Sequence, residues 1–301
     1  MAAVYGGAAG ESSTASATAG GGKRWEDLNR DLLVAIFERI GVADLIAGVP
    51  FVCSSWRDAS RDPLCWRKLD FRDWDSISLR LDRQRDEVLD FADLLNFSTS
   101  RAREHVESIY FPDFADDIHL LNISERCPEL TYFSLPNLHV IEHKFCEAVS
   151  NLEFLKGMAV DESVVSREVL QHVNQCCKYF TELSVFAENV DEEKASIICK
   201  SLPALRKLEI TNSAISRQAI ITFLDELKAL EHLDISGYEN SGITDVVLEK
   251  ASHLNVFLWD SRFELGEFMD CSNNEEDDWL LQRPCECMLD RKVMEWLAEL
   301  S

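Results

Sequence analysis

Between residues 25 and 66, the apolar positions recur at helical spacing in three short runs. The runs contain Leu32, Leu33, Ile36, Phe37 and Ile40, then Leu45 and Ile46, and then Val52, Cys53, Trp56 and Ala59. Gly41, Pro50 and Pro63 interrupt or end these runs, because glycine and proline terminate helices. We therefore predict three short helices, with Asp31 capping the first. Roughly 40 residues bury too little surface to be stable alone, so a partner or the rest of the chain must complete this unit.

From residue 106 onward, the pattern changes to apolar-x-x-apolar-x-apolar and occurs seven times. The copies are Val106-Ile109-Phe111, Leu130-Phe133-Leu135, Leu152-Leu155-Gly157, Phe180-Leu183-Val185, Leu205-Leu208-Ile210, Leu230-Leu233-Ile235 and Leu254-Phe257-Trp259. Their middle residues are 24, 22, 28, 25, 25 and 24 positions apart, which is the range of leucine-rich repeats. The third copy is the weakest, because Gly157 replaces an inward apolar residue. An eighth copy, Trp66-Leu69-Phe71, overlaps the end of the predicted helices.

Helical runs lie between these copies, for example around Val169, Leu170 and Val173. A unit of one strand and one helix cannot bury its apolar face alone, so neighbouring units must stack. The predicted fold is a curved α/β solenoid of about seven to eight leucine-rich repeats, preceded by the three N-terminal helices. We expect parallel strands on the inside of the curve and helices on the outside.

Alternate residues of each predicted strand point away from the core, into the hollow of the curve. In the first half of the array they include four aromatic residues and a lysine, namely Tyr110, Tyr132, Phe154, Lys156 and Phe186. Exposed aromatic residues with a polar rim are typical of protein-binding hot spots. We therefore predict that a partner protein docks on this half of the array. The alternative is that the aromatic residues pack against each other or against the C-terminal residues.

The charge of the chain restricts the kinds of partner. The 301 residues include 30 basic and 54 acidic ones, for a formal net charge of −24. Nucleic-acid binding depends on clustered Lys and Arg, so this excess of acidic residues argues against nucleic acid and against an anionic membrane surface. A basic protein partner is compatible with it. No signal peptide or membrane-spanning run is recognisable, so we expect a soluble, intracellular chain with reduced thiols.

We find no sequence motif for catalysis or for a bound metal. The chain lacks a Gly-rich phosphate loop, a nucleophile elbow and a paired-His metal motif. Cys176-Cys177 and Cys285-x-Cys287 have no second pair at zinc-site spacing. Most of the ten cysteines lie in apolar helical runs, where free cysteine packs as a small hydrophobic residue. We expect no catalytic residue, no metal ligand and no cofactor.

The two ends of the chain differ from the rest. Residues 1–22 are rich in Gly, Ala, Ser and Thr, and we predict a disordered leader there. Residues 262–301 contain an acidic run at positions 273–278, predicted to be a loop, and then apolar residues at helical spacing. This predicted C-terminal helix could cap the open end of the solenoid or bind a partner in a groove, and the sequence leaves both open.

The N-terminal pattern, assigned to residues 23–72, resembles an F-box. The matching residues are Leu28, Leu32, Ile36, Phe37, Ile40, Asp44, Leu45, Val52, Cys53, Trp56, Arg57, Asp62, Pro63 and Trp66. One position departs from the family, because Leu28 is followed by Asn29 where a proline is usual, and Asn can cap the helix instead. The resemblance implies binding to a Skp-type adaptor and, through it, to a cullin. The adaptor-binding residues would be Leu28, Leu32, Ile36, Phe37, Ile40, Leu45, Val49, Val52 and Trp56.

With repeats at residues 73–261, the chain looks like a plant-type F-box/leucine-rich-repeat protein. That resemblance implies a non-catalytic, substrate-recognition subunit of an SCF-type ubiquitin ligase, located in the nucleus and/or the cytoplasm. Its target protein is not readable from the sequence. One alternative is a non-ligase leucine-rich-repeat scaffold, in which the N-terminal helices only cap the array. A third possibility is a hydrolase that uses an unrecognised Cys-His pair.

Overall fold

The computed structural model describes residues 25, 28–82, 90–103, 105–137, 140–237 and 242–259. The predicted leader at residues 1–22 and the predicted acidic loop and C-terminal helix at residues 262–301 lie outside the described residues. The chain divides into one unit of residues 1–261 and a second of residues 262–301, and everything below concerns the first.

Three short α-helices and two 3₁₀ turns form the N-terminal segment. They are α1 (Arg30–Phe37), α2 (Val42–Ala47), η2 (Val49–Phe51), α3 (Ser54–Ala59) and η3 (Pro63–Trp66). Asn29 caps α1, since its Oδ1 accepts a hydrogen bond from the Asp31 backbone N–H at 3.1 Å. The predicted cap at Asp31 was therefore wrong, because the helix begins at Arg30 and places Asp31 inside its first turn, where an acidic residue favours the helix dipole.

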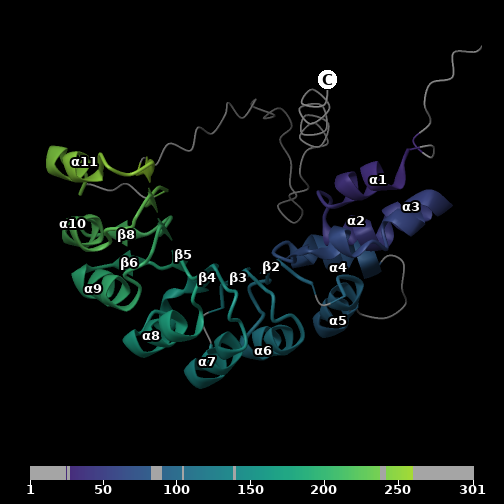
Figure 1. Ribbon diagram of the computed structural model, residues 1–301, viewed down its shortest axis with the longest axis horizontal. Coiled ribbons are helices and arrows are strands. Elements are labelled where there is room, and N and C mark those ends of the chain that lie inside the picture. Colours follow the sequence, from purple (N-terminus) through teal and green to yellow (C-terminus); the bar gives the residue numbers. More distant parts are fainter. Residues whose placement is uncertain are drawn as a thin grey trace, which may run out of the picture. The chain divides into compact units, whose positions relative to one another are not determined.

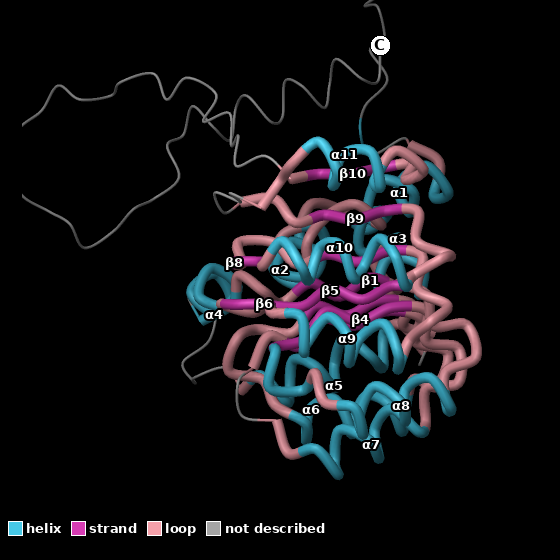
Figure 2. Tube along the Cα trace, turned by 90° about the vertical axis from the view of Figure 1, so that its left-hand side faces the viewer, coloured by secondary structure: helices cyan, strands magenta, loops and turns pink. Residues whose placement is uncertain are grey.

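Eight parallel strands form the main sheet within the described residues. They are β1 (Lys68–Asp70), β2 (Ser108–Tyr110), β3 (Tyr132–Leu135), β4 (Gly157–Asp161), β5 (Glu182–Phe186), β7 (Lys207–Glu209), β9 (His232–Asp234) and β10 (Val256–Leu258). They follow one another in chain order across the sheet, and each pairs in parallel with the strand before or after it in this series. Figure 2 shows the strands of the sheet stacked above one another. The short strands β6 (Asn189–Val190) and β8 (Ala214–Ile215) form a second, two-stranded sheet.

Helices connect successive strands. They are α4 (Trp74–Asp82), α5 (Phe91–Arg101), α6 (Asp117–Arg126), α7 (Glu142–Ser150), α8 (Arg167–Cys176), α9 (Glu192–Ser201), α10 (Arg217–Glu226) and α11 (Asp245–Ala251), with a 3₁₀ turn η4 (Glu162–Val164) before α8. Helices α6 to α11 pack in sequence on one side of the main sheet (Figure 1). The opposite side carries no helix of this series, and we call it the open face. The prediction of a leucine-rich-repeat-like solenoid with a parallel sheet is thus confirmed.

One row of aligned side chains builds the core of the array. The row consists of Leu69, Ile109, Phe133, Met158, Leu183, Leu208 and Leu233, which pair in register and are all buried. The same hydrophobic cluster continues into the N-terminal segment through Leu33, Phe37 and Trp66. The short helices therefore gain stability from a core that they share with the repeats, as their small size requires.

The third repeat has a different register from the predicted one. Met158, not Leu155, pairs with Phe133 and Leu183, and the inward residues are Leu155, Met158 and Val160. Leu152 and Leu155 misled the prediction because they repeat the apolar spacing three residues too early. Gly157 consequently lies on the open face and replaces no core residue.

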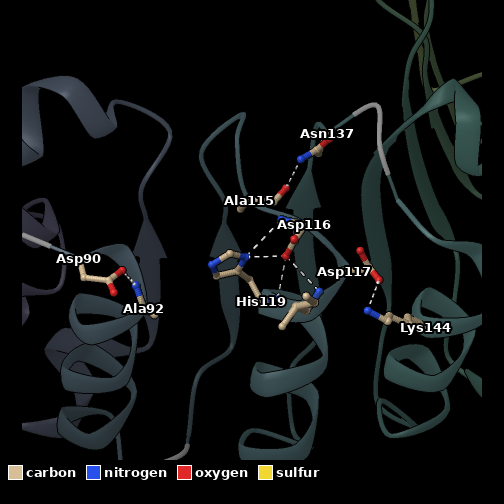
Figure 3. A network of polar contacts seen from close by, with 9 residues as sticks. Asp90, Ala92, Ala115, Asp116, Asp117, His119, Asn137 and Lys144 are labelled. Carbon is tan, nitrogen blue, oxygen red and sulfur yellow. Dashed lines mark hydrogen bonds and ion pairs between the residues drawn. The ribbon is translucent and has the colours of Figure 1, made fainter.

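The start of α6 shows how the helices of the array are capped (Figure 3). Asp116 Oδ1 accepts hydrogen bonds from the backbone N–H groups of Ile118 at 3.1 Å and His119 at 3.3 Å, and it lies 2.7 Å from His119 Nδ1. Burial alone would raise the pKa of the Asp116 carboxyl, but the hydrogen bonds from His119 and Ile118 outweigh burial and lower it. The adjacent Asp117 reaches toward Lys144 of α7, 3.9 Å away, and so links two consecutive helices.

Replacing Asp116 with alanine should lower the free energy of unfolding by about 1 kcal/mol at neutral pH, the usual cost of removing a helix cap. Because the folded-state pKa is lowered, this stabilisation exists above the unfolded-state pKa of about 3.9 and disappears as the pH falls through the folded-state value. Urea denaturation at several pH values would measure it. The exposed Asp113→Ala is the matched control, and an equal loss in both variants, or a difference that does not shrink in acid, would contradict this role.

Candidate functional site

Three large apolar side chains of the N-terminal segment are exposed to solvent. Leu32 of α1 is 56% exposed, and Phe51 and Val52, which follow Pro50, are 67% and 59% exposed. The preceding helix α2 ends at Ala47, and Pro50 lies in the 3₁₀ turn η2, which ends at Phe51 and has Val52 as its C-cap. Phe51 was not among the predicted binding residues, although its position directly after a helix-breaking proline was a usable signal.

The other predicted adaptor-binding residues divide into two groups by burial. Leu28, Ile36, Ile40 and Trp56 are half-buried. Phe37, Leu45 and Val49 are buried, and Phe37 packs edge-to-face on Trp56 with ring centroids 5.3 Å apart. The buried three hold the helices together, so the residues available to a partner are Leu32 and Val52 and, in part, the four half-buried ones.

Polar contacts fix the helices of this segment relative to each other. Arg30 of α1 forms an ion pair with Asp62 at 2.6 Å, and Arg57 Nε donates to the Pro50 carbonyl at 3.0 Å. Asp44 of α2 pairs with Arg80 of α4, beside a hollow of about 590 Å³ between these two helices. The helices that carry the exposed apolar side chains are therefore held in place by these ion pairs and hydrogen bonds.

A second candidate surface is a hollow of about 680 Å³ on the open face of the sheet. It is lined by Arg72, Tyr110, Phe111, Asp113, Tyr132, Ser134, Pro136, Ala159, Glu182, Ser184, Phe186, Lys207 and Glu209. Its lining includes the small side chains of Ser134, Ala159 and Ser184. At Gly157, an added Cβ would lie 2.8 Å from the Glu182 Cβ and 3.0 Å from Tyr132 Cδ2. The absence of a side chain there lets Tyr132 and Glu182 approach each other.

Aromatic rings and an arginine form one wall of the hollow. The rings of Tyr110 and Tyr132 lie 5.5 Å apart, and the Arg72 guanidinium lies 4.6 Å from the centre of the Tyr110 ring. Arg72 also donates to both carboxylate oxygens of Asp70, at 3.0 and 2.6 Å. Burial alone would raise the pKa of Asp70, but these bonds outweigh it and lower it. The wall therefore presents π surface next to a charge pair that is already neutralised.

The opposite wall contains acidic groups. Lys207 Nζ lies 2.8 Å from Glu209 Oε1. Burial alone would lower the pKa of Lys207, but Glu209 and then Glu182 raise it, so the lysine stays charged. Burial, followed by the charges of Tyr110, Glu209 and Glu182, raises the pKa of Tyr132. At neutral pH the Tyr132 hydroxyl is thus protonated, and it can both donate and accept hydrogen bonds.

Two of the predicted open-face residues lie elsewhere. Strand β4 begins at Gly157, so Phe154 and Lys156 precede it and belong to the turn that enters the strand. Phe154 stacks on Tyr179, which occupies the same turn of the next repeat, with ring centroids 6.2 Å apart and the planes within 7°. The predicted position of Phe154 and Lys156 on the open face was therefore wrong, because it rested on the incorrect register of the third repeat. Tyr110, Tyr132 and Phe186 do line the hollow.

The thiols of the array are mainly part of the packing. The pKa of Cys177 is raised to about 12, mainly by burial and to a lesser degree by the charge of Cys176. The more exposed Cys176 has its Sγ 3.5 Å from His172 Nε2, and that nitrogen also lies 2.8 Å from Ser150 Oγ and 3.0 Å from the Cys146 carbonyl oxygen. The His172 side chain is thus shared among groups of two adjacent helices.

None of the helices that the structure describes is both long enough and apolar enough to cross a membrane.

Comparisons with known proteins find a family match for the N-terminal segment and similar proteins over most of the chain. Residues 25–72 match the F-box-like family model. A protein of Arabidopsis thaliana described as an F-box/LRR-repeat protein is 28% identical over 283 residues, which cover 86% of this chain and 91% of the relative. The F-box protein SKIP19 of the same plant is 26% identical and covers 76% of this chain and 74% of its own length. The putative F-box/LRR-repeat protein 23, also from Arabidopsis thaliana, is 22% identical, with coverage of 85% and 55%.

A solved structure described as a TLR13–ssRNA13 complex has a TM-score of 0.36 and 17% sequence identity, and covers 52% of this chain and 22% of that one.

Proposed function

We propose that this chain, a plant-type F-box/leucine-rich-repeat protein, is the substrate-recognition subunit of an SCF-type ubiquitin ligase. The observation that carries the proposal is the coincidence of the F-box-like match at residues 25–72 with exposed apolar side chains on that same segment. Leu32 and Val52 have no covering partner in the described part of the chain, and large exposed apolar residues of this kind mark protein-interaction sites.

In this proposal the N-terminal segment binds a Skp-type adaptor, which in turn contacts a cullin. Leu32 and Val52, joined by Phe51, supply the apolar contacts, and Leu28, Ile36, Ile40 and Trp56 form their half-buried surroundings. Phe37, Leu45 and Val49 support this surface from beneath. In a binding hot spot, a few side chains provide most of the binding energy, and the contacts around them exclude water.

The open-face hollow would hold the target protein. Tyr110, Tyr132 and Phe186 give it large, rigid aromatic contacts, and Glu182 and Glu209 give it polar specificity. Tyrosine is enriched at such contacts because it offers a large apolar ring and a hydroxyl that can hydrogen bond. The acidic residues favour a target segment with basic side chains.

The mechanism would be positional. A solenoid that carries the adaptor site at one end and the target site on its open face keeps the target close to the ubiquitin-conjugating enzyme, which raises the effective concentration of a target lysine. The chain itself contributes binding and orientation, and the bond-forming chemistry belongs to its partners. Such a subunit would act in the nucleus and/or the cytoplasm.

The adaptor proposal is tested by the affinity of the purified chain for a Skp-type adaptor, measured by calorimetry. Leu32→Asp combined with Ile36→Asp should abolish binding, because two charges would be placed in an apolar contact. The matched control is Val246→Asp combined with Leu248→Asp, which places the same charges on exposed apolar positions of α11. No binding by the folded wild type would reject the ligase proposal and favour a scaffold whose N-terminal helices only cap the array.

The target proposal is tested separately, in a chain that still binds the adaptor. Tyr110→Ala, Tyr132→Ala and Phe186→Ala together should remove the bound target proteins that quantitative mass spectrometry detects with the wild type. Phe154→Ala with Tyr179→Ala is the control, because these exposed rings lie outside the hollow. If the control pair loses the same proteins and the triple variant keeps them, the target site lies on the turns and not in the hollow.

A further inference from the structure

Three potential metal ligands meet on neighbouring strands of the open face, outside any role assigned above except that of Glu209. Glu209 of β7 pairs in register with Asp234 of β9, and His232 precedes Asp234 by two residues, which places it on the same face. One ligand atom from each of these residues lies within 4.8 Å of the others. Two carboxylates at such a separation repel each other unless a cation offsets their charge.

The imidazole of His232 is the unusual member of this cluster. Its Nε2 atom is shielded from solvent and has no hydrogen-bond partner among the described residues. Glu209 Oε1 lies 3.8 Å from this nitrogen. A buried polar atom without a partner costs about 1–3 kcal/mol, so its persistence beside two carboxylates needs an explanation. In the tautomer protonated at Nδ1, Nε2 presents a lone pair toward Glu209.

Neighbouring groups hold both carboxylates in place. Asp234 Oδ1 accepts hydrogen bonds from the Ser236 backbone N–H at 3.0 Å and from Ser236 Oγ at 2.6 Å. Glu209 Oε1 lies 2.8 Å from Lys207 Nζ. Supporting hydrogen bonds of this kind orient the ligands of metal sites. The two carboxylates of the cluster carry more negative charge than the single ammonium of Lys207 offsets.

We propose that Glu209, His232 and Asp234 bind a divalent first-row transition metal ion, with Zn²⁺ as the probe. One imidazole and two carboxylates form a donor set that suits such ions. Donor atoms on one tetrahedral Zn²⁺ at about 2.0–2.2 Å are roughly 3.4 Å apart, so the ligand atoms, which lie within 4.8 Å of one another, need to close by at most about 1.4 Å. Three protein donors leave a coordination position for an outside ligand. No sequence motif indicated the site, because Glu209 and His232 lie one repeat apart.

The first experiment is titration of the full-length chain with Co²⁺, which substitutes for Zn²⁺ and reports its ligands by absorption. We expect one ion per chain, with d–d bands of nitrogen and oxygen donors and without thiolate-to-cobalt charge transfer. His232→Ala should abolish this signal, and the near-isosteric Glu209→Gln and Asp234→Asn should weaken it strongly. His253→Ala, at an exposed histidine of the last repeat, is the control and should leave it unchanged.

Lys207 provides a second, opposite test. Its ammonium pairs with the Glu209 carboxylate and would compete with the metal ion for it. Lys207→Gln removes this competing charge and should tighten Zn²⁺ binding by about tenfold. Ions bound only by cysteines would be indifferent to Lys207 and to His232. The proposal is overturned if the wild type binds no stoichiometric ion, if His232→Ala binds as the wild type does, or if the only cobalt signal is thiolate charge transfer.

Discussion

Replacing Trp66 with alanine is expected to lower the free energy of unfolding by about 3–5 kcal/mol, the range for deleting a large buried aromatic side chain. Trp66 is only 2% exposed, and its ring packs edge-to-face on Phe97 of α5 at 5.8 Å. Its indole N–H donates to the Ser60 carbonyl at 2.8 Å. Alanine would leave a cavity and also a buried carbonyl without its donor, and these two costs add.

The position of Trp66 makes this change important for both halves of the molecule. It ends η3, and a single residue, Arg67, separates it from β1, so it lies where the N-terminal helices join the first strand of the sheet. Urea denaturation followed by far-UV circular dichroism would measure the effect. Trp25→Ala is the control, because Trp25 is 61% exposed and such surface substitutions usually change stability by no more than about 0.5 kcal/mol. Equal shifts in the two variants would show that the junction is not part of the cooperative core.

The repeat architecture could be predicted because each repeat contributes the same inward residues to one core. A single buried row contains Ile109, Phe133, Leu183 and Leu208. The number of residues between successive members of the row therefore equals the length of one repeat. The apolar spacing predicts the wrong strand position in the third repeat, because Leu152 and Leu155 reproduce that spacing just before the observed strand. Only the hydrogen-bonded register, which pairs Met158 with Phe133, removes that ambiguity.

The binding surfaces were predicted less completely than the fold. Helical periodicity identifies apolar positions but not which of them the rest of the chain covers, so Leu45 and Leu32 looked alike although one is buried and the other exposed. Strand alternation placed Tyr110, Tyr132 and Phe186 correctly, and its error at Phe154 followed from the wrong register. The cluster of Glu209, His232 and Asp234 depends on contacts between strands, which a single sequence does not reveal.

Val52→Asp and Val49→Asp should separate adaptor binding from folding, since the same substitution is made three residues apart. Val52 is 59% exposed and Val49 is 6% exposed. At Val52, the aspartate stays solvated in the free chain and is desolvated only by the partner. We expect unchanged stability and an adaptor affinity at least about 30-fold weaker, which is the loss of a hot spot of about 2 kcal/mol.

At Val49, the charge would enter the packed helices, so the N-terminal segment should unfold. Adaptor binding would then be lost, and the helical circular-dichroism signal would fall with it. The thermal melt would begin at a lower temperature than that of the wild type. Calorimetric titration with the adaptor and a thermal melt of each variant distinguish the two cases. If Val52→Asp binds the adaptor as tightly as the wild type, its exposed position lies outside the contact, and the adaptor must bind through the other residues of the proposed surface. If Val52→Asp melts like Val49→Asp, the exposure of Val52 is not that of the folded chain in solution, and the assignment of this surface to a partner fails.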